Sequence, residues 1–219
     1  MRGRKGSALK LRNQMPTRRT TGSSQDKLPA FFYRLPPHAQ RCYLESDSIT
    51  RYEFVPDAAS SRSVAALTRV LAKGNAADTE NAARKTAAEM CRMAGVAPVA
   101  VDVREVRPKN ARGELHGLFY PADPRRRMPP NIVLWMRTAE RREVVKPRTF
   151  VRTLMHELVH YFDYSVLKLE DSFHTRGFFA RESYLVRTTV ALKEAAPKPE
   201  EGPALLRAWL DRHTRDPDR

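Results

Sequence analysis

Apolar residues recur every three or four positions in the first half of the chain, the spacing of helices with one buried face. The clearest case places Val64, Leu67 and Leu71 on one side of a helix. Proline or a capping residue precedes each such pattern, and glycine follows two of them. We therefore expect three helices: from Pro36-Pro37 to about Glu45, from Ser61 or Ser63 to about Lys73, and from Asp78 or Thr79 to about Met93.

After Gly95 the pattern changes to the alternation of apolar and polar residues that is typical of strands. We expect three strands, over Val99–Val103, Gly117–Tyr120 and Asn131–Arg137. Two helices should follow, from Pro147 to about Leu167 and from about Thr175 to Glu194. Strands followed by helices predict an α+β fold with a sheet of three strands or slightly more.

The two ends of the chain differ in composition from its middle. Residues 1–27 are mainly basic, Ser, Thr and Gly residues with few apolar anchors, which predicts a disordered basic arm. We divide the rest into an N-terminal helical region over 28–95, a core over 96–194, and a proline-containing linker with a short C-terminal helix over 195–219.

The chain is strongly basic. Its 40 Lys and Arg residues against 25 Asp and Glu residues give a formal net charge of +15 over 219 residues. This excess fits a polyanion partner such as DNA, bound in a salt-sensitive manner, and it fits equally well a basic surface without such a partner.

Composition and motifs also argue against several classes of protein. No apolar run approaches the roughly 18 residues that cross a bilayer, so we expect no membrane partner. Two cysteines exclude both a disulfide scaffold and a zinc ribbon built on four cysteines. The basic N-terminus lacks the apolar segment of a secretory signal, so we expect a cytoplasmic protein, with an organelle transit peptide as the alternative.

An HExxH motif lies in the long helix that is expected from Pro147, formed by His156, Glu157 and His160. Residues four apart face the same side of a helix, so the two imidazoles can bind one tetrahedral Zn²⁺. Glu157 is rotated from His156 by about 100° and can reach a metal-bound water. A separate apolar stripe should bury the helix on one side while its histidines face a cleft: Val151, Leu154, Leu158 and Phe162.

A zinc hydrolase needs a third protein ligand and an open fourth position. We expect the third ligand to be His174, which follows His160 by fourteen residues across a short loop. Glu182 is the alternative, and the two are too far apart along a helix to bind one ion together.

Asp163 faces the same way as the two histidines but lies almost one turn further along the helix. Its short side chain suits a hydrogen bond to a ligand histidine or to nearby backbone better than a bond to the metal. The alternative is an aspartate that faces solvent.

The segments Thr153–Asp163 and Asp171–Phe179 resemble the SprT-like group of zincin metalloproteases. In that group an HExxH helix is followed, after a loop, by a third histidine at the head of a second helix, with a glycine and an aromatic residue nearby. The resemblance covers roughly residues 97–193. It implies a small zincin-like domain, in which a sheet packs on the HExxH helix and the following helix.

The same resemblance implies that His156, His160 and His174 bind Zn²⁺ and that Glu157 is the catalytic glutamate. Two features depart from the family pattern. The chain has too few cysteines for the zinc ribbon that many members carry, and Thr175-Arg176 separates the third histidine from the glycine.

The function implied is that of a zinc-dependent metalloendopeptidase, in which Glu157 activates a zinc-bound water to hydrolyse protein or peptide substrates. The family includes proteases that cut DNA-associated proteins. We expect an edge strand over residues 132–137 to pair with the substrate, and His116, Tyr184 or Arg187 to stabilise the oxyanion. The alternative function is a basic nucleic-acid-binding module with a structural or degenerate zinc site.

Overall fold

The computed structural model describes residues 28–111 and 113–195, with side chains up to residue 189. Its elements follow in chain order: a 3-10 helix at Phe32–Arg34, α1 Pro37–Ser48, α2 Ala58–Leu71, α3 Ala76–Met93, β1 Ala100–Val106, β2 Lys109–Asn110, β3 Gly113–Glu114, β4 Gly117–Tyr120, β5 Asn131–Arg137, α4 Pro147–Ser165 and α5 Arg176–Ala195. The expected α+β class is confirmed, and within the described residues each expected helix and strand is present.

The starting residues of α2 and α3 differ from the expectation. Asp57, not Ser61 or Ser63, caps α2 and accepts a hydrogen bond from the backbone N–H of Ser60 at 2.9 Å. Asn75, not Asp78 or Thr79, caps α3 in the same way. Each helix begins earlier than its apolar pattern, because capping depends on one side-chain oxygen and not on hydrophobic spacing.

The three longer strands form one sheet in the order β1-β5-β4. β1 runs parallel to β5, and β4 runs antiparallel to it, with Phe119 opposite Ile132. β5 is therefore the central strand, and the expectation that residues 132–137 form an edge is wrong. In the described part of the chain, β4 pairs with β5 alone, so β4 is an edge strand.

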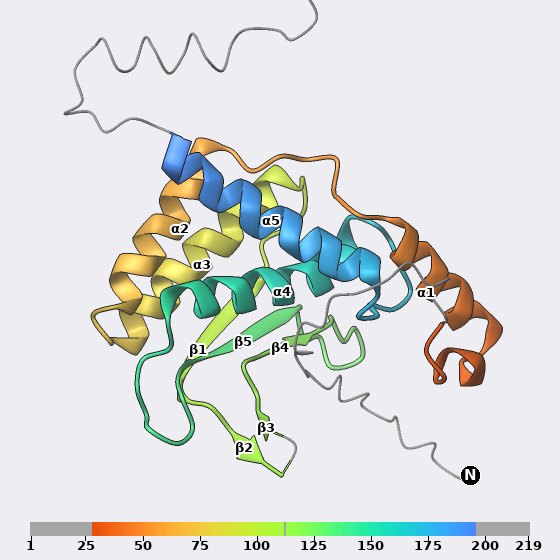
Figure 1. Cartoon of the computed structure of the whole chain (residues 1–219), viewed down its shortest axis with the longest axis horizontal. Coiled ribbons are helices and arrows are strands. Elements are labelled where there is room, and N and C mark those ends of the chain that lie inside the picture. The colour runs from red at the N-terminus through yellow and green to blue at the C-terminus, as the bar shows by residue number, and fades with distance from the viewer. Residues whose placement is uncertain (1–27, 112, 196–219) are drawn as a thin grey trace, which may run out of the picture.

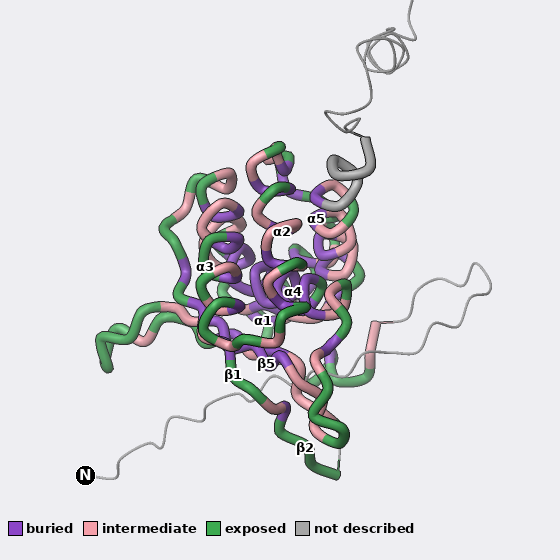
Figure 2. The backbone as a smooth tube through the Cα atoms, turned by 90° about the vertical axis from the view of Figure 1, so that its left-hand side faces the viewer, coloured by how far each residue is buried: buried purple, intermediate pink, exposed green. Residues whose placement is uncertain are grey.

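Helix α4 lies between the sheet and helices α2 and α5, while α3 packs on β1 (Figure 1). From Phe150 to Asp163 every residue except Arg152 is buried. The tube in Figure 2 shows the same arrangement, with buried segments concentrated around α4 and exposed segments on the outer helices. The expected apolar stripe of this helix is buried, and most of its remaining surface is covered as well.

One hydrophobic core joins the helices before residue 95 to the strands and helices after it. It includes Leu67 of α2, Met90 of α3, Leu134 of β5, Leu158 of α4 and Leu185 of α5. Helix α5 contacts α1, α2 and α4, and α2 and α3 also contact α4, so two of the N-terminal helices pack directly on the helix that carries the motif.

The expected basic arm, the proline-containing linker and the short C-terminal helix lie outside the described residues. Among the helices that are described, none combines the length and hydropathy required to cross a membrane.

Candidate metal centre

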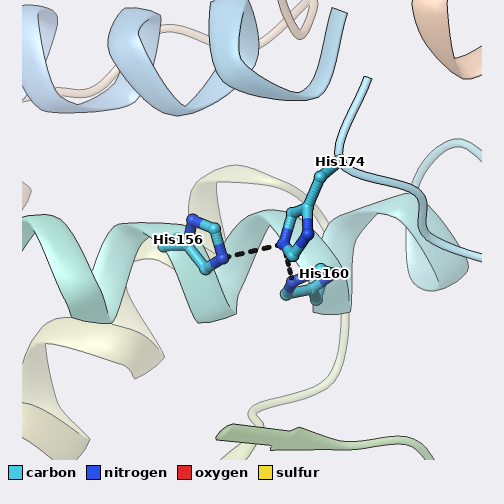
Figure 3. A group of neighbouring side chains, drawn as sticks. All are labelled: His156, His160 and His174. Atoms are coloured by element: carbon cyan, nitrogen blue, oxygen red, sulfur yellow. Dashed lines mark hydrogen bonds between the residues drawn. The ribbon is translucent and has the colours of Figure 1, made fainter. Parts of the chain in front are cut away.

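Three histidine side chains from two segments meet at one point (Figure 3). His156 and His160 come from successive turns of α4, and His174 comes from the loop before α5. The Nε2 atom of His174 lies 3.0 Å from Nε2 of His156 and 3.1 Å from Nε2 of His160. His156 and His160 are buried, and His174 is partly buried. The sequence spacing had indicated this set, and the structure brings the three side chains together.

Glu182 of α5 holds the other ring nitrogen of His156. Its Oε2 lies 3.0 Å from His156 Nδ1, and its Oε1 accepts a hydrogen bond from Arg152. Burial alone would raise the pKa of Glu182, but His156 and Arg152 hold it below its usual value. The carboxylate therefore accepts a hydrogen bond from Nδ1–H of His156, which leaves the lone pair of Nε2 available to a metal. The position of Glu182 at Nδ1 is that of a partner of a ligand, and not that of the alternative third ligand.

Ser172 holds the corresponding nitrogen of His160. The serine Oγ lies 2.8 Å from His160 Nδ1 and donates its one proton to Asp163 at 2.7 Å. The serine oxygen can then only accept a hydrogen bond from His160. Nδ1 of that ring therefore carries the proton, and Nε2 carries the lone pair. Asp163 thus reaches the histidine through a serine instead of directly. It is fully buried, which corrects the solvent-facing alternative.

Asp163 is ionised beside a buried arginine. Burial raises the pKa of Asp163 to about 6, although Arg181 and Ser172 lower it, so the carboxyl is charged at neutral pH. Arg181 lies 3.0 Å from Asp163 Oδ1 and is itself wholly buried. Sequence reasoning missed Ser172 and Arg181, since a serine in a loop and an arginine in a helix are ordinary surface residues by pattern alone.

The proton positions make this cluster suited to a cation. Two Nε2 atoms present lone pairs, and a neutral His174 can donate a proton to at most one of them. Extra protons are disfavoured, because burial and the neighbouring histidines lower the pKa of His160 well below its usual value and that of His174 to about 4. Three imidazoles that converge on one point are a common donor set for Zn²⁺ in catalytic sites.

Glu157 lies in the same pocket with one oxygen free. Its side chain is 2% exposed, and its Oε1 has no hydrogen-bond partner among the described residues. Burial raises the pKa of Glu157 to about 7, although neighbouring His156 and the backbone N–H of Phe119 lower it. A carboxyl with that pKa can take up and release a proton near neutral pH.

The opposite wall of the pocket is β4. Gly117, Leu118 and Phe119 line it, together with the three histidines and Glu157. A Cβ atom at position 117 would lie 2.5 Å from Glu157 Oε1, so the glycine makes room for the carboxyl group.

The expected oxyanion donors lie elsewhere. In the described part of the chain, none of His116, Tyr184 and Arg187 lines the pocket. Tyr184 donates its hydroxyl proton to the backbone oxygen of Phe54. His116 precedes Gly117 in the chain, and since successive strand residues face opposite sides, its side chain points away from α4.

Comparisons with known proteins add no family to this description. No family model matches the chain, and searches of curated proteins and of solved structures found no match. The functional argument therefore depends on the site itself.

Proposed function

We propose that the chain is a zinc-dependent metallopeptidase of the SprT-like zincin type. The observation that carries the proposal is the meeting of three Nε2 atoms in one pocket beside a buried Glu157 with an unpartnered oxygen. These are the ligands and the base that hydrolysis of a peptide bond requires. The order of elements, with the motif helix packed between a small sheet and the helix that follows the third histidine, agrees with a zincin-like domain.

His156, His160 and His174 would hold the metal through their Nε2 atoms. Zn²⁺ held there supplies Lewis acidity, which polarises a carbonyl group and favours deprotonation of an attacking water. Glu157 accepts the proton of that water and passes it to the leaving amine. Glu182 and Ser172 keep the lone pairs of the two helix histidines directed at the metal.

The free edge of β4 suits an extended peptide. The backbone N–H of Trp135 bonds to the oxygen of His116, so in the alternating antiparallel ladder Gly117 and Phe119 direct their backbone groups away from β5. Those groups border the pocket of Glu157, where the N–H of Phe119 already donates to the carboxyl group of Glu157. A substrate that pairs with this edge would present its backbone to the metal, and main-chain pairing accepts many sequences.

DNA-associated proteins are the substrate class that we favour. The support is the formal net charge of +15, which attracts nucleic acid together with the proteins bound to it.

The alternative is a basic nucleic-acid-binding module with a structural zinc site. A structural zinc site is closed by four protein ligands. In the described residues the ligand group contains three histidines, while Glu182 is hydrogen-bonded to Nδ1 of His156 and Asp163 to Ser172. This favours catalysis over a structural role.

Glu157→Gln tests the proposal. The amide cannot accept the proton, so we expect cleavage of an unstructured protein such as casein to fall by at least about 100-fold, while zinc content stays that of the wild type. Assays with and without added DNA measure the dependence on nucleic acid. Glu170→Gln, an exposed change in the loop before α5, should cleave normally. Wild-type cleavage by Glu157→Gln would refute the mechanism.

A further inference from the structure

Arg181, in the second turn of α5, contacts the C-terminal end of α1. It donates hydrogen bonds to the backbone oxygens of Ser46 and Ile49, at 2.8 Å and 2.5 Å, and to the hydroxyl of Ser46 at 3.0 Å. The last carbonyl groups of a helix have no partner within it, so the guanidinium satisfies two acceptors of the α1 terminus. It also forms the buried ion pair with Asp163 of α4.

From Asp163 the hydrogen bonds continue to His160, one of the three candidate metal ligands. Asp163 accepts from Ser172, and Ser172 accepts from His160 Nδ1. The orientation of the His160 ring is therefore set by a continuous buried chain of hydrogen bonds that ends on the carbonyl groups of α1.

A second path leads from α1 to His174. The carboxylate of Asp47 accepts a hydrogen bond from the backbone N–H of Arg176 at 2.8 Å. The hydroxyl of Ser46 lies 3.2 Å from that of Thr175. Thr175 and Arg176 follow His174 directly in the chain. Contacts from α1 thus fix the backbone that carries the third histidine.

The two helix ends are also in close steric contact. A Cβ atom at Gly177 would overlap the backbone oxygens of Ser46, Asp47 and Ile49. In Figure 1 the C-terminal end of α1 lies against the start of α5, next to the loop that leads into that helix. A small change where these two helix ends meet therefore shifts both the end of α1 and the start of α5.

We propose that the C-terminal end of α1 is part of the metal centre. It positions His160 through Arg181, Asp163 and Ser172, and it positions His174 through the first turn of α5. This inference rests on the proposed metal site and assigns a role to a helix that contains none of its ligands. Ser46 is the positioning residue that both paths share.

Ser61 offers a matched control. Like Ser46, it is a buried serine of an N-terminal helix that contacts α5, and it donates to the backbone oxygen of Thr189 at 2.9 Å. Thr189 lies thirteen residues beyond the start of α5 at Arg176, about 20 Å along the helix and away from the histidines. Loss of either hydroxyl removes contacts to α5, but only Ser46 is connected to the ligands.

The experiment compares Zn²⁺ affinity, by competition with a chromogenic chelator, in the full chain and in Ser46→Ala and Ser61→Ala. Loss of a direct partner of a ligand costs roughly 10- to 100-fold in affinity. Ser46 lies further from the ligands than such a partner, so we expect Ser46→Ala to bind at least about threefold more weakly. Ser61→Ala should bind like the wild type, even where thermal unfolding of the metal-free chains shows equal destabilisation. The visible spectrum of bound Co²⁺ should change in Ser46→Ala alone.

A second pair of variants tests the same inference in case Ser46→Ala does not fold. Asp47→Ala removes the acceptor of the Arg176 N–H and should weaken zinc binding, while Asp47→Asn keeps an acceptor oxygen and should restore it. Equal affinity in all variants, or equal losses in Ser46→Ala and Ser61→Ala, would overturn the inference and leave the metal site intact. A wild-type chain that binds no divalent metal would instead remove the proposed function, and this inference with it.

Discussion

At the scale of single residues, hydrogen-bond partners determine which ring nitrogen of each helix histidine carries the proton. His156 and His160 offer Nε2 because Glu182 and Ser172 occupy their Nδ1 atoms. The sequence predicted the two histidines, since a spacing of four on a helix has only one geometry. It could not predict their partners, because these depend on how α5 and its preceding loop pack against α4.

Gly117→Ala tests the fit between β4 and the base. The added methyl group would lie 2.5 Å from Glu157 Oε1 and 2.6 Å from Cγ2 of buried Thr153, so the carboxyl group must move. A displacement of about 1 Å costs on the order of 100-fold in rate, so we expect a loss of that size in peptide cleavage. Zinc content should not change, since the atoms nearest to the added methyl group belong to Glu157 and Thr153. Unaltered cleavage would show that Glu157 does not need its present position.

At the scale of elements, hydrophobic period predicted where helices and strands lie, and local polar contacts decided where they end. The sequence placed β4 correctly from its apolar run, but it assigned the edge to residues 132–137. Strand order depends on long-range pairing between β1 and β5, which no local pattern encodes. Asp57 and Asn75 were missed as caps because they precede the apolar pattern that marks each helix.

Asp57→Ala measures the cap of α2. We expect a loss of about 1 kcal/mol in the free energy of unfolding at pH 7, measured by urea denaturation. The Ser60 N–H and Arg92 lower the pKa of Asp57, so its contribution is present above its unfolded pKa and disappears as the pH falls below about 4. The difference between wild type and variant should therefore shrink in acid. A difference that is constant with pH would mean that the charge of Asp57 contributes nothing.

Gly177→Ala tests the junction of α1 and α5. The methyl group would lie 2.7 Å from the backbone oxygens of Asp47 and Ile49, and backbone cannot move aside as a flexible side chain can. We expect a loss of about 3 kcal/mol in the free energy of unfolding of the metal-free chain. Gly95→Ala is the control: it has open space but a φ of +67°, so it should lose only about 1 kcal/mol. Equal losses would refute the close contact.

At the scale of the whole molecule, the α+β class was predictable from the sequence, but the role of the N-terminal helices was not. Residues 28–95 matched no pattern with a function, yet α1 and α2 both contact α5. The contacts of Arg181 with Ser46 join residues 135 positions apart. Such contacts arise only when distant elements pack on a shared core, so periodicity and motifs cannot reveal them.

The most direct test of the account is the zinc content and affinity of the purified chain beside His174→Ala, measured by elemental analysis after reconstitution and by chelator competition. The account predicts about one zinc per wild-type chain, and a loss of affinity in the variant of at least about tenfold, because one of three ligands is removed. A wild-type chain that holds no zinc after reconstitution, or a variant that binds it with full affinity, would contradict the three-histidine site.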